Sequence, residues 1–112
     1  MGILEIEIMN AIWTMLEENE DRNIAITDVV AFLENNGTTR AYTTIKTVMD
    51  RLVTKGTLSR FKNGKKFFYV AAIDRFEATK SALQEVGEQF FANNFSNMIK
   101  FIEQNFDSKI FA

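Results

Sequence analysis

The chain has 112 residues, of which 46% are hydrophobic and 25% charged, and its net charge is −2. This composition is typical of a globular protein, and the length is that of one domain or of a small domain with an appendage. It contains no cysteine and no histidine, which excludes disulfides, thiolate or imidazole metal sites and Ser-His-Asp triads, so we expect no metal or cofactor. Glu5 and Glu7 interrupt the first apolar run and no run approaches the ~20 residues that span a bilayer, so we expect a cytoplasmic protein.

The segment from Ile3 to Glu18 is predicted to form an amphipathic helix. Leu4, Ile8, Ile12 and Leu16 recur every four residues, which places them on one broad apolar face. Trp13 is expected in the core rather than as a stacking platform for a ligand.

A second helix is predicted through Asn35, preceded by a short apolar run, 23–26, that could make one edge-strand pairing. Thr27 is the expected N-cap, with Asp28 in the first turn, where a negative charge is favourable. Gly37 is expected to end the helix because glycine readily adopts the left-handed conformation found there.

The third predicted helix runs from about Ala41 to Lys55 and is stopped by Gly56. Its apolar residues recur at three- and four-residue spacing and are expected to face the core: Ile45, Val48, Met49, Leu52 and Val53. The opposite face is polar, with Thr43, Thr44, Lys46, Thr47, Asp50, Arg51 and Thr54.

A β-hairpin is predicted after Gly56. Asn63 and Gly64, with β-prone residues on both sides, are a strong signal for a hairpin turn. The order helix, short strand, helix, helix, hairpin is that of a winged helix-turn-helix. We therefore predict a mainly α fold with a small β-hairpin and place the DNA-binding domain at residues 1–72.

Residues 73–112 are predicted to form two further helices, separated near Asn93 and Asn94, as a C-terminal helical dimerisation extension. Seven of the eleven phenylalanines fall in this region, more than two terminal helices can cover by themselves. Burial against a second copy is the preferred interpretation, over folding back on the first domain. The residues expected to mediate it are Phe76, Leu83, Val86, Phe90, Phe91, Phe95, Met98, Ile99 and Ile102.

Positive charge is concentrated between Arg40 and Lys66, where eight basic residues and one acid give +7, whereas the remainder carries −9. Such a segment usually faces a polyanion. A solvated helix face would normally mix both signs, and Asp50 is the only acid here. The predicted DNA-binding residues are small, polar or basic groups on the third helix and at the hairpin tip: Tyr42, Thr43, Thr44, Lys46, Thr47, Arg51, Lys62, Lys65 and Lys66.

Three stretches carry a family resemblance: LEIEIMNAIW near the start, AYTTIKTVMDRLVTKGTLSR in the middle and KKFFYV in the hairpin. The chain resembles the penicillinase-repressor family (BlaI/MecI type) over about Leu4 to Asn105. The resemblance implies a homodimeric winged-helix repressor that binds a palindromic operator, with contacts from Thr43, Thr44, Lys46, Thr47 and Arg51 and from the hairpin tip.

Two departures from the family pattern limit what the resemblance implies. Copper-responsive relatives carry a C-terminal cysteine cluster, and this chain has no cysteine. The β-lactam-responsive members are inactivated when a sensor-linked protease cuts an Asn-Phe bond. The matching position here is 100–102, and the pairs Asn94-Phe95 and Asn105-Phe106 are out of register. The sequence therefore offers no in-register Asn-Phe bond for a sensor protease as partner.

The predicted function is a sequence-specific transcriptional repressor that acts as a homodimer on a palindromic DNA operator. The alternative is a winged-helix module that binds another protein through its Phe-rich C-terminal helices. An enzyme is not expected, because the sequence has neither paired carboxylates in an apolar setting nor a phosphate-cradling glycine loop.

Overall fold

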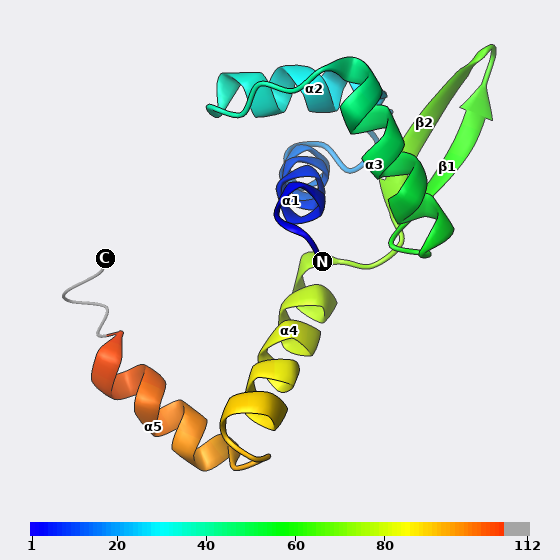
Figure 1. Cartoon of the computed structure of the whole chain (residues 1–112). Helices are drawn as coiled ribbons and strands as arrows, with labels where there is room; N and C mark the ends of the chain where they lie inside the picture. The colour runs from blue at the N-terminus through cyan, green and yellow to red at the C-terminus, as the bar shows by residue number, and fades with distance from the viewer. Residues whose placement is uncertain (107–112) are drawn as a thin grey trace. The chain divides into compact units, whose positions relative to one another are not determined.

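The computed structural model describes residues 1–106, which form five helices and one two-stranded antiparallel sheet (Figure 1). Within it the chain divides into two compact units, one of residues 1–75 and one from Phe76 onward. The first unit contains, in chain order, α1 (Ile3–Glu18), α2 (Ile26–Asn35), α3 (Tyr42–Thr54), β1 (Leu58–Asn63) and β2 (Lys66–Ala71). This is the order of a winged helix, so the predicted fold class is confirmed.

The core of the first unit lies where α1, α2 and α3 pack together. The predicted apolar faces of the first and third helices are confirmed, since Ile8 and Ile12 of α1 and Ile45, Met49 and Leu52 of α3 are buried completely. The predicted bounds of the third helix are correct to one residue at each end, because Ala41 and Lys55 are its caps. Because this buried stripe cannot turn outward, it determines which residues of α3 reach solvent.

The start of α2 differs from the prediction. Ala25, not Thr27, is the N-cap, and the helix begins at Ile26. The Asp28 carboxylate, three residues after the cap, accepts a hydrogen bond from the Ala25 N–H at 2.9 Å, which is the reciprocal half of a capping box. The edge-strand pairing predicted for residues 23–26 is present as a single bridge, in which the Tyr69 N–H donates to the Ile24 carbonyl at 2.8 Å.

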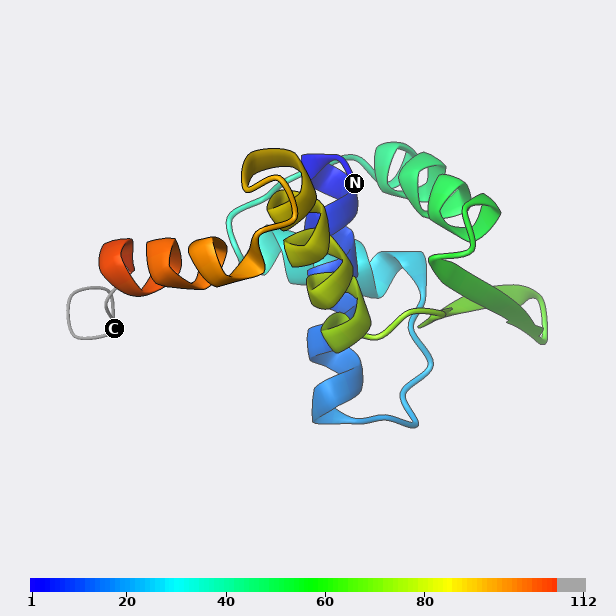
Figure 2. The ribbon, with the colours of Figure 1, turned by 90° about the horizontal axis from the view of Figure 1, so that it is seen from below.

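The hairpin lies beside α3 in both ribbon views (Figures 1 and 2). Its two-residue loop consists of Gly64 and Lys65, because Asn63 pairs with Lys66 at the ends of the strands. The turn is therefore one residue later than the predicted Asn63–Gly64. Gly64 has φ of +68°, and a positive φ is required at the first position of such turns.

The chain after the hairpin is held against α1 by two side chains. The Trp13 indole N–H donates to the Ile73 carbonyl at 2.9 Å, and Trp13 is buried as predicted. The Arg75 guanidinium donates to both carboxylate oxygens of Glu17, at 2.7 and 2.8 Å, and to the Thr14 hydroxyl at 3.0 Å. These contacts fix the end of the first unit onto its first helix.

The second unit is a pair of helices, α4 (Arg75–Phe90) and α5 (Phe95–Asn105). The predicted break is present, and Ala92 and Asn93 both have positive φ. The Asn94 side chain caps α5 by accepting from the Asn97 N–H at 3.0 Å. Phe95 packs onto Gly87 so closely that a Cβ at residue 87 would overlap the Phe95 ring. This contact explains why a glycine stands at residue 87 within α4.

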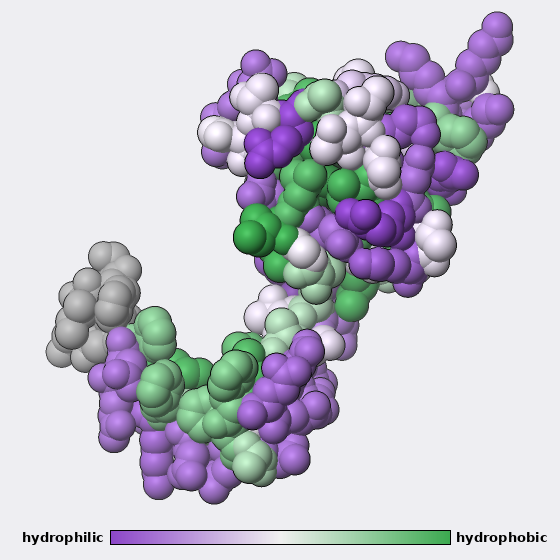
Figure 3. Space-filling view, viewed as in Figure 1, coloured by the Kyte–Doolittle hydropathy of each residue, from purple (hydrophilic) through white to green (hydrophobic). Residues whose placement is uncertain are grey.

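Apolar side chains remain exposed on this second unit and gather on the surfaces of α4 and α5 (Figure 3). Of the predicted dimerisation residues, Met98 is buried and Phe91 is half-buried against Phe101, their ring centroids lying 5.7 Å apart. The others are exposed in the single chain: Phe76, Leu83, Val86, Phe90, Phe95, Ile99 and Ile102. No helix in the described part of the chain is long and apolar enough to cross a membrane.

Candidate nucleic-acid interface

All nine residues predicted to contact DNA are exposed in the structure. At 100° per residue, the outward arc of α3 is centred on Thr43, Thr47 and Thr54. Lys46 lies on the edge of this arc that faces the hairpin, and Arg51 lies on the edge that faces α1. The predicted contact residues of the helix therefore cover its whole exposed side rather than a narrow stripe.

Two of the three threonine hydroxyls at the centre of this arc donate to carbonyls of their own helix. The Thr47 hydroxyl donates to the Thr43 carbonyl at 2.9 Å, and the Thr54 hydroxyl donates to the Asp50 carbonyl at 3.1 Å. A threonine bonded to the preceding turn keeps its methyl group available for outside contacts. The Thr47 and Thr54 hydroxyls are therefore engaged as donors, while their oxygen lone pairs and methyl groups remain available for outside contacts.

Asp50 joins α3 to the hairpin. One carboxylate oxygen lies 2.7 Å from Lys46 Nζ, and the other lies 3.3 Å from a guanidinium nitrogen of Arg60 on β1. The hydrogen bond to Asp50 raises the pKa of Lys46 above its usual value. The one acid of the basic segment therefore bridges α3 and the hairpin through two ion pairs that are open to solvent.

The opposite edge of α3 rests on Glu5, a buried carboxylate in α1. Lys55 Nζ lies 3.0 Å from one Glu5 oxygen, and Arg51 Nε lies 3.8 Å from the other. The hydrogen bond from Lys55 and the nearby positive charges lower the pKa of Glu5, against burial, which raises it. Arg51 is about half exposed, so its guanidinium is held at one end while remaining accessible to solvent.

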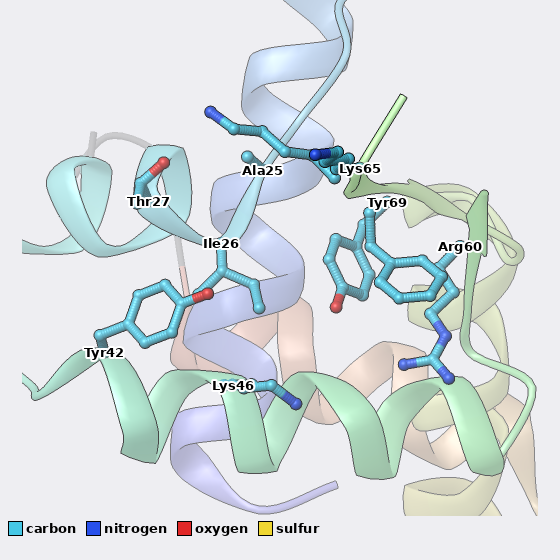
Figure 4. A pocket seen from close by; sticks show the side chains of 10 residues that line it. Ala25, Ile26, Thr27, Tyr42, Lys46, Arg60, Lys65 and Tyr69 are labelled. Atoms are coloured by element: carbon cyan, nitrogen blue, oxygen red, sulfur yellow. The ribbon is translucent and has the colours of Figure 1, made fainter. Parts of the chain in front are cut away.

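A basic groove of about 310 Å³ lies between α3, the hairpin and the start of α2 (Figure 4). Lys46 points into it between Tyr42 and Arg60, and the Tyr69 hydroxyl points toward α3 (Figure 4). Burial raises the pKa of Tyr69, which Arg60 partly offsets, so its hydroxyl stays protonated. The lining consists of four cations, three aromatic residues and the start of α2: Lys46, Arg60, Lys65, Lys66, Tyr42, Phe67, Tyr69, Ala25, Ile26 and Thr27.

The hairpin surface combines charge with aromatic rings. The Arg60 guanidinium carbon lies 4.6 Å from the centroid of Phe67, and Lys62 Nζ lies 5.5 Å from it, both within cation–π range. On the other face, Phe61 and Phe68 pack with their centroids 5.9 Å apart. These aromatic rings hold the basic side chains of the hairpin in place. The tip residues Lys62, Lys65 and Lys66 stay exposed to solvent.

Several residues that build this surface were not among the predicted contacts, among them Glu5, Asp50, Arg60, Phe67 and Tyr69. Glu5 had one visible signal, a carboxylate within the apolar run of the first helix. Arg60 lies directly across from Tyr69 in the hairpin register, which alternation along the strands could have indicated. The described residues hold no group of three or more acidic side chains able to bind a metal ion.

The fold and this surface define a winged-helix protein with a basic α3–hairpin face. The family model of the penicillinase repressors matches residues 1–109, and the chain belongs to that family. The resemblance inferred from the sequence motifs is therefore confirmed.

Two solved structures resemble the chain. The monomeric form of BlaI from Bacillus licheniformis, solved in complex with the blaP half-operator, is 31% identical, with 67% of this chain and 83% of that one covered and a TM-score of 0.51. The ferric uptake regulator of Francisella tularensis, with iron, is 22% identical over 64% of this chain and 52% of that one, with a TM-score of 0.50, and this likeness shows the fold alone.

A curated relative comes from Latilactobacillus sakei, a 16.5 kDa protein named for its place in the ptsI 3′ region. It is 32% identical over 84 residues, which are 75% of this chain and 53% of the relative. The chain thus spans about half the length of this relative.

We expect Glu5→Gln to lower stability at neutral pH by about 1 kcal/mol, since Glu5 is buried but its partner Lys55 is half exposed. Because the pKa of Glu5 is lowered in the folded state, its contribution is present above the unfolded-state value and is lost as pH falls through the folded-state value. Urea unfolding at pH 7 and pH 3 measures this, and the gap between parent and variant should narrow at pH 3.

Glu18→Gln is the matched control, since Glu18 is exposed at the end of the same helix. It should leave stability nearly unchanged at both pH values. An equal gap for Glu5→Gln at pH 7 and pH 3 would contradict the ionic role of Glu5.

Proposed function

We propose that this chain is a sequence-specific DNA-binding transcriptional repressor that acts as a homodimer on a palindromic operator. The observation that carries the proposal is the exposed basic face formed by α3 and the hairpin, in a chain that is otherwise acidic. Membership of a repressor family and the likeness to BlaI, which was solved with a half-operator, support it. In this proposal the protein acts by binding and has no catalytic activity, and it works in the cytoplasm, where its DNA target lies.

In the proposed complex, α3 enters the major groove. Its outward threonine methyls contact base edges, and Lys46 and Arg51, on the two edges of the arc, reach the phosphates or guanine edges of the flanking strands. The hairpin tip lies over the adjacent backbone, where Lys62, Lys65 and Lys66 neutralise phosphates. Glu5 holds Arg51 and Asp50 holds Lys46 before DNA arrives.

The homodimer is proposed from the second unit. Phe76 and Phe90 are 71% and 76% exposed, and Leu83, Ile99 and Ile102 are also open to solvent. An apolar surface of this kind on a small unit is typical of a protein interface. Two copies related by a two-fold axis would present two α3 helices to half-sites about 34 Å apart, one turn of DNA.

Substitution of the two edge cations tests the DNA contacts. Lys46→Ala and Arg51→Ala should each weaken binding to a specific duplex about tenfold at physiological salt. Each should also make the salt dependence shallower, by about 0.9 in the log–log slope for every phosphate that is no longer neutralised. Fluorescence anisotropy across a salt series measures both quantities.

Lys100→Ala removes an equal charge from α5 and should leave binding near that of the parent. If Lys46→Ala and Arg51→Ala both bind like the Lys100→Ala variant, α3 is not the DNA-reading helix. A module that binds protein instead would show weak, sequence-independent attraction to duplex DNA in every variant.

The dimer is tested by Ile99→Glu. Ile99 is 53% exposed in the single chain, so the substitution is compatible with folding but places a charge in the proposed interface. Light scattering should show a shift from dimer to monomer. Gln104→Glu adds the same charge on the opposite side of α5 and should leave the dimer intact; a dimer that persists in Ile99→Glu would place the interface elsewhere.

A further inference from the structure

We propose that Asp50 is an exchangeable counter-ion: in the free protein its carboxylate holds Lys46 and Arg60, and in the complex a phosphate of the DNA strand in the basic groove takes its place. This inference rests on the proposed function and specifies how its site changes on binding. Asp50 thus acts as an internal competitor of the DNA and lowers the affinity for any duplex.

The geometry of Asp50 is that of a group standing in for a phosphate. Its two oxygens are divided between Lys46 and Arg60, at 2.7 and 3.3 Å, as two oxygens of a phosphate would be. Lys46 comes from α3 and Arg60 from β1, so the carboxylate bridges the two elements that would straddle a DNA strand. Both cations also line the groove, whereas Asp50 itself does not.

The groove has room and charge for the incoming anion. Its volume of about 310 Å³ is roughly ten times the ~30 Å³ that one water occupies in the liquid, enough for a phosphate group with several waters. Lys65 and Lys66 from the hairpin tip also line it, and within residues 1–106 neither forms an ion pair with an acid. A phosphate would therefore gain two further cations that Asp50 does not reach.

The exchange costs little because the existing pairs are open to water. The side chains of Asp50, Arg60 and Lys46 are 35%, 39% and 50% exposed, and ion pairs with such exposure contribute little. Glu5 contrasts with this arrangement, since its side chain is only 9% exposed. We therefore assign Glu5 a permanent role under α3 and Asp50 a replaceable one.

A rigid link is the competing interpretation of Asp50. In that case the carboxylate stays on Lys46 and Arg60 in the complex and keeps the hairpin at the correct angle to α3. The two interpretations predict opposite effects of removing the charge, since loss of a competitor strengthens DNA binding and loss of a link weakens it.

The test compares Asp50→Asn, which keeps the shape and removes the charge, with Glu18→Gln, which removes one negative charge from an exposed site at the end of α1. Binding of the full chain to a specific duplex is measured at physiological salt. Asp50→Asn should bind the duplex about tenfold more tightly than Glu18→Gln. When both variants also carry Arg60→Gln, most of this difference in affinity should disappear. Equal or weaker binding by Asp50→Asn would overturn the proposal.

A measurement on the unmodified chain avoids any effect of the substitution on folding. The carboxylate ¹³C signal of Asp50 is followed while duplex or inorganic phosphate is added at constant ionic strength, with the Glu18 signal as reference. A shift with duplex alone assigns the exchange to the DNA strand. A shift with both shows that a phosphate group alone displaces the carboxylate, and no shift with either overturns the proposal.

The proposed function and the role of Asp50 fail separately. If the parent chain shows no salt-dependent binding to duplex DNA, the proposed function is wrong. If the parent binds and Asp50→Asn gains nothing over Glu18→Gln, only the role of Asp50 is wrong.

Discussion

The buried stripe of α3 is the constraint on which the candidate interface depends. Ile45, Met49 and Leu52 are completely enclosed, so the helix cannot rotate without exposing them, and burial of such side chains contributes roughly 1.5–3 kcal/mol each. The orientation of the outward threonines follows from this packing. Ion pairs at the two edges then secure the helix, Glu5 toward α1 and Asp50 toward the hairpin.

Glu5 and Asp50 differ in how far their carboxylates are exposed to solvent. Glu5 is buried and retains its charge because Lys55 and Arg51 lower its pKa, so it belongs to the fold. Asp50 is open to solvent and divides its oxygens between two cations that also line the basic groove. A surface with one fixed and one exchangeable acid can be ordered before DNA binds and still present its full charge afterwards.

Features that depend on local periodicity were predictable from the sequence. The apolar spacing of residues 45–53 predicted α3 to within one residue at each end, and the glycine signals located the hairpin and the ends of the helices. The N-cap of α2 was mispredicted because the cap is Ala25, whose side chain has no hydrogen-bonding group to mark it in the sequence, and the hairpin turn was displaced by one residue because Asn63 continues the strand.

Features that depend on contacts distant in sequence were not predictable. The Glu5–Lys55 pair joins residues fifty positions apart, and the groove combines residues from α2, α3 and the hairpin. The close contact between Gly87 and Phe95 arises only after the turn between α4 and α5 has formed.

Selection of bound sequences from a random duplex library tests the central claim most directly, because the library contains every candidate half-site and the protein itself chooses among them. The account predicts an inverted repeat whose half-site centres lie about one helical turn, roughly 34 Å, apart. Such a result would establish specificity, the two-fold arrangement and the spacing of the two α3 helices together. Recovery of sequences with no shared motif would contradict a sequence-specific repressor, and a single unrepeated motif would contradict the homodimer.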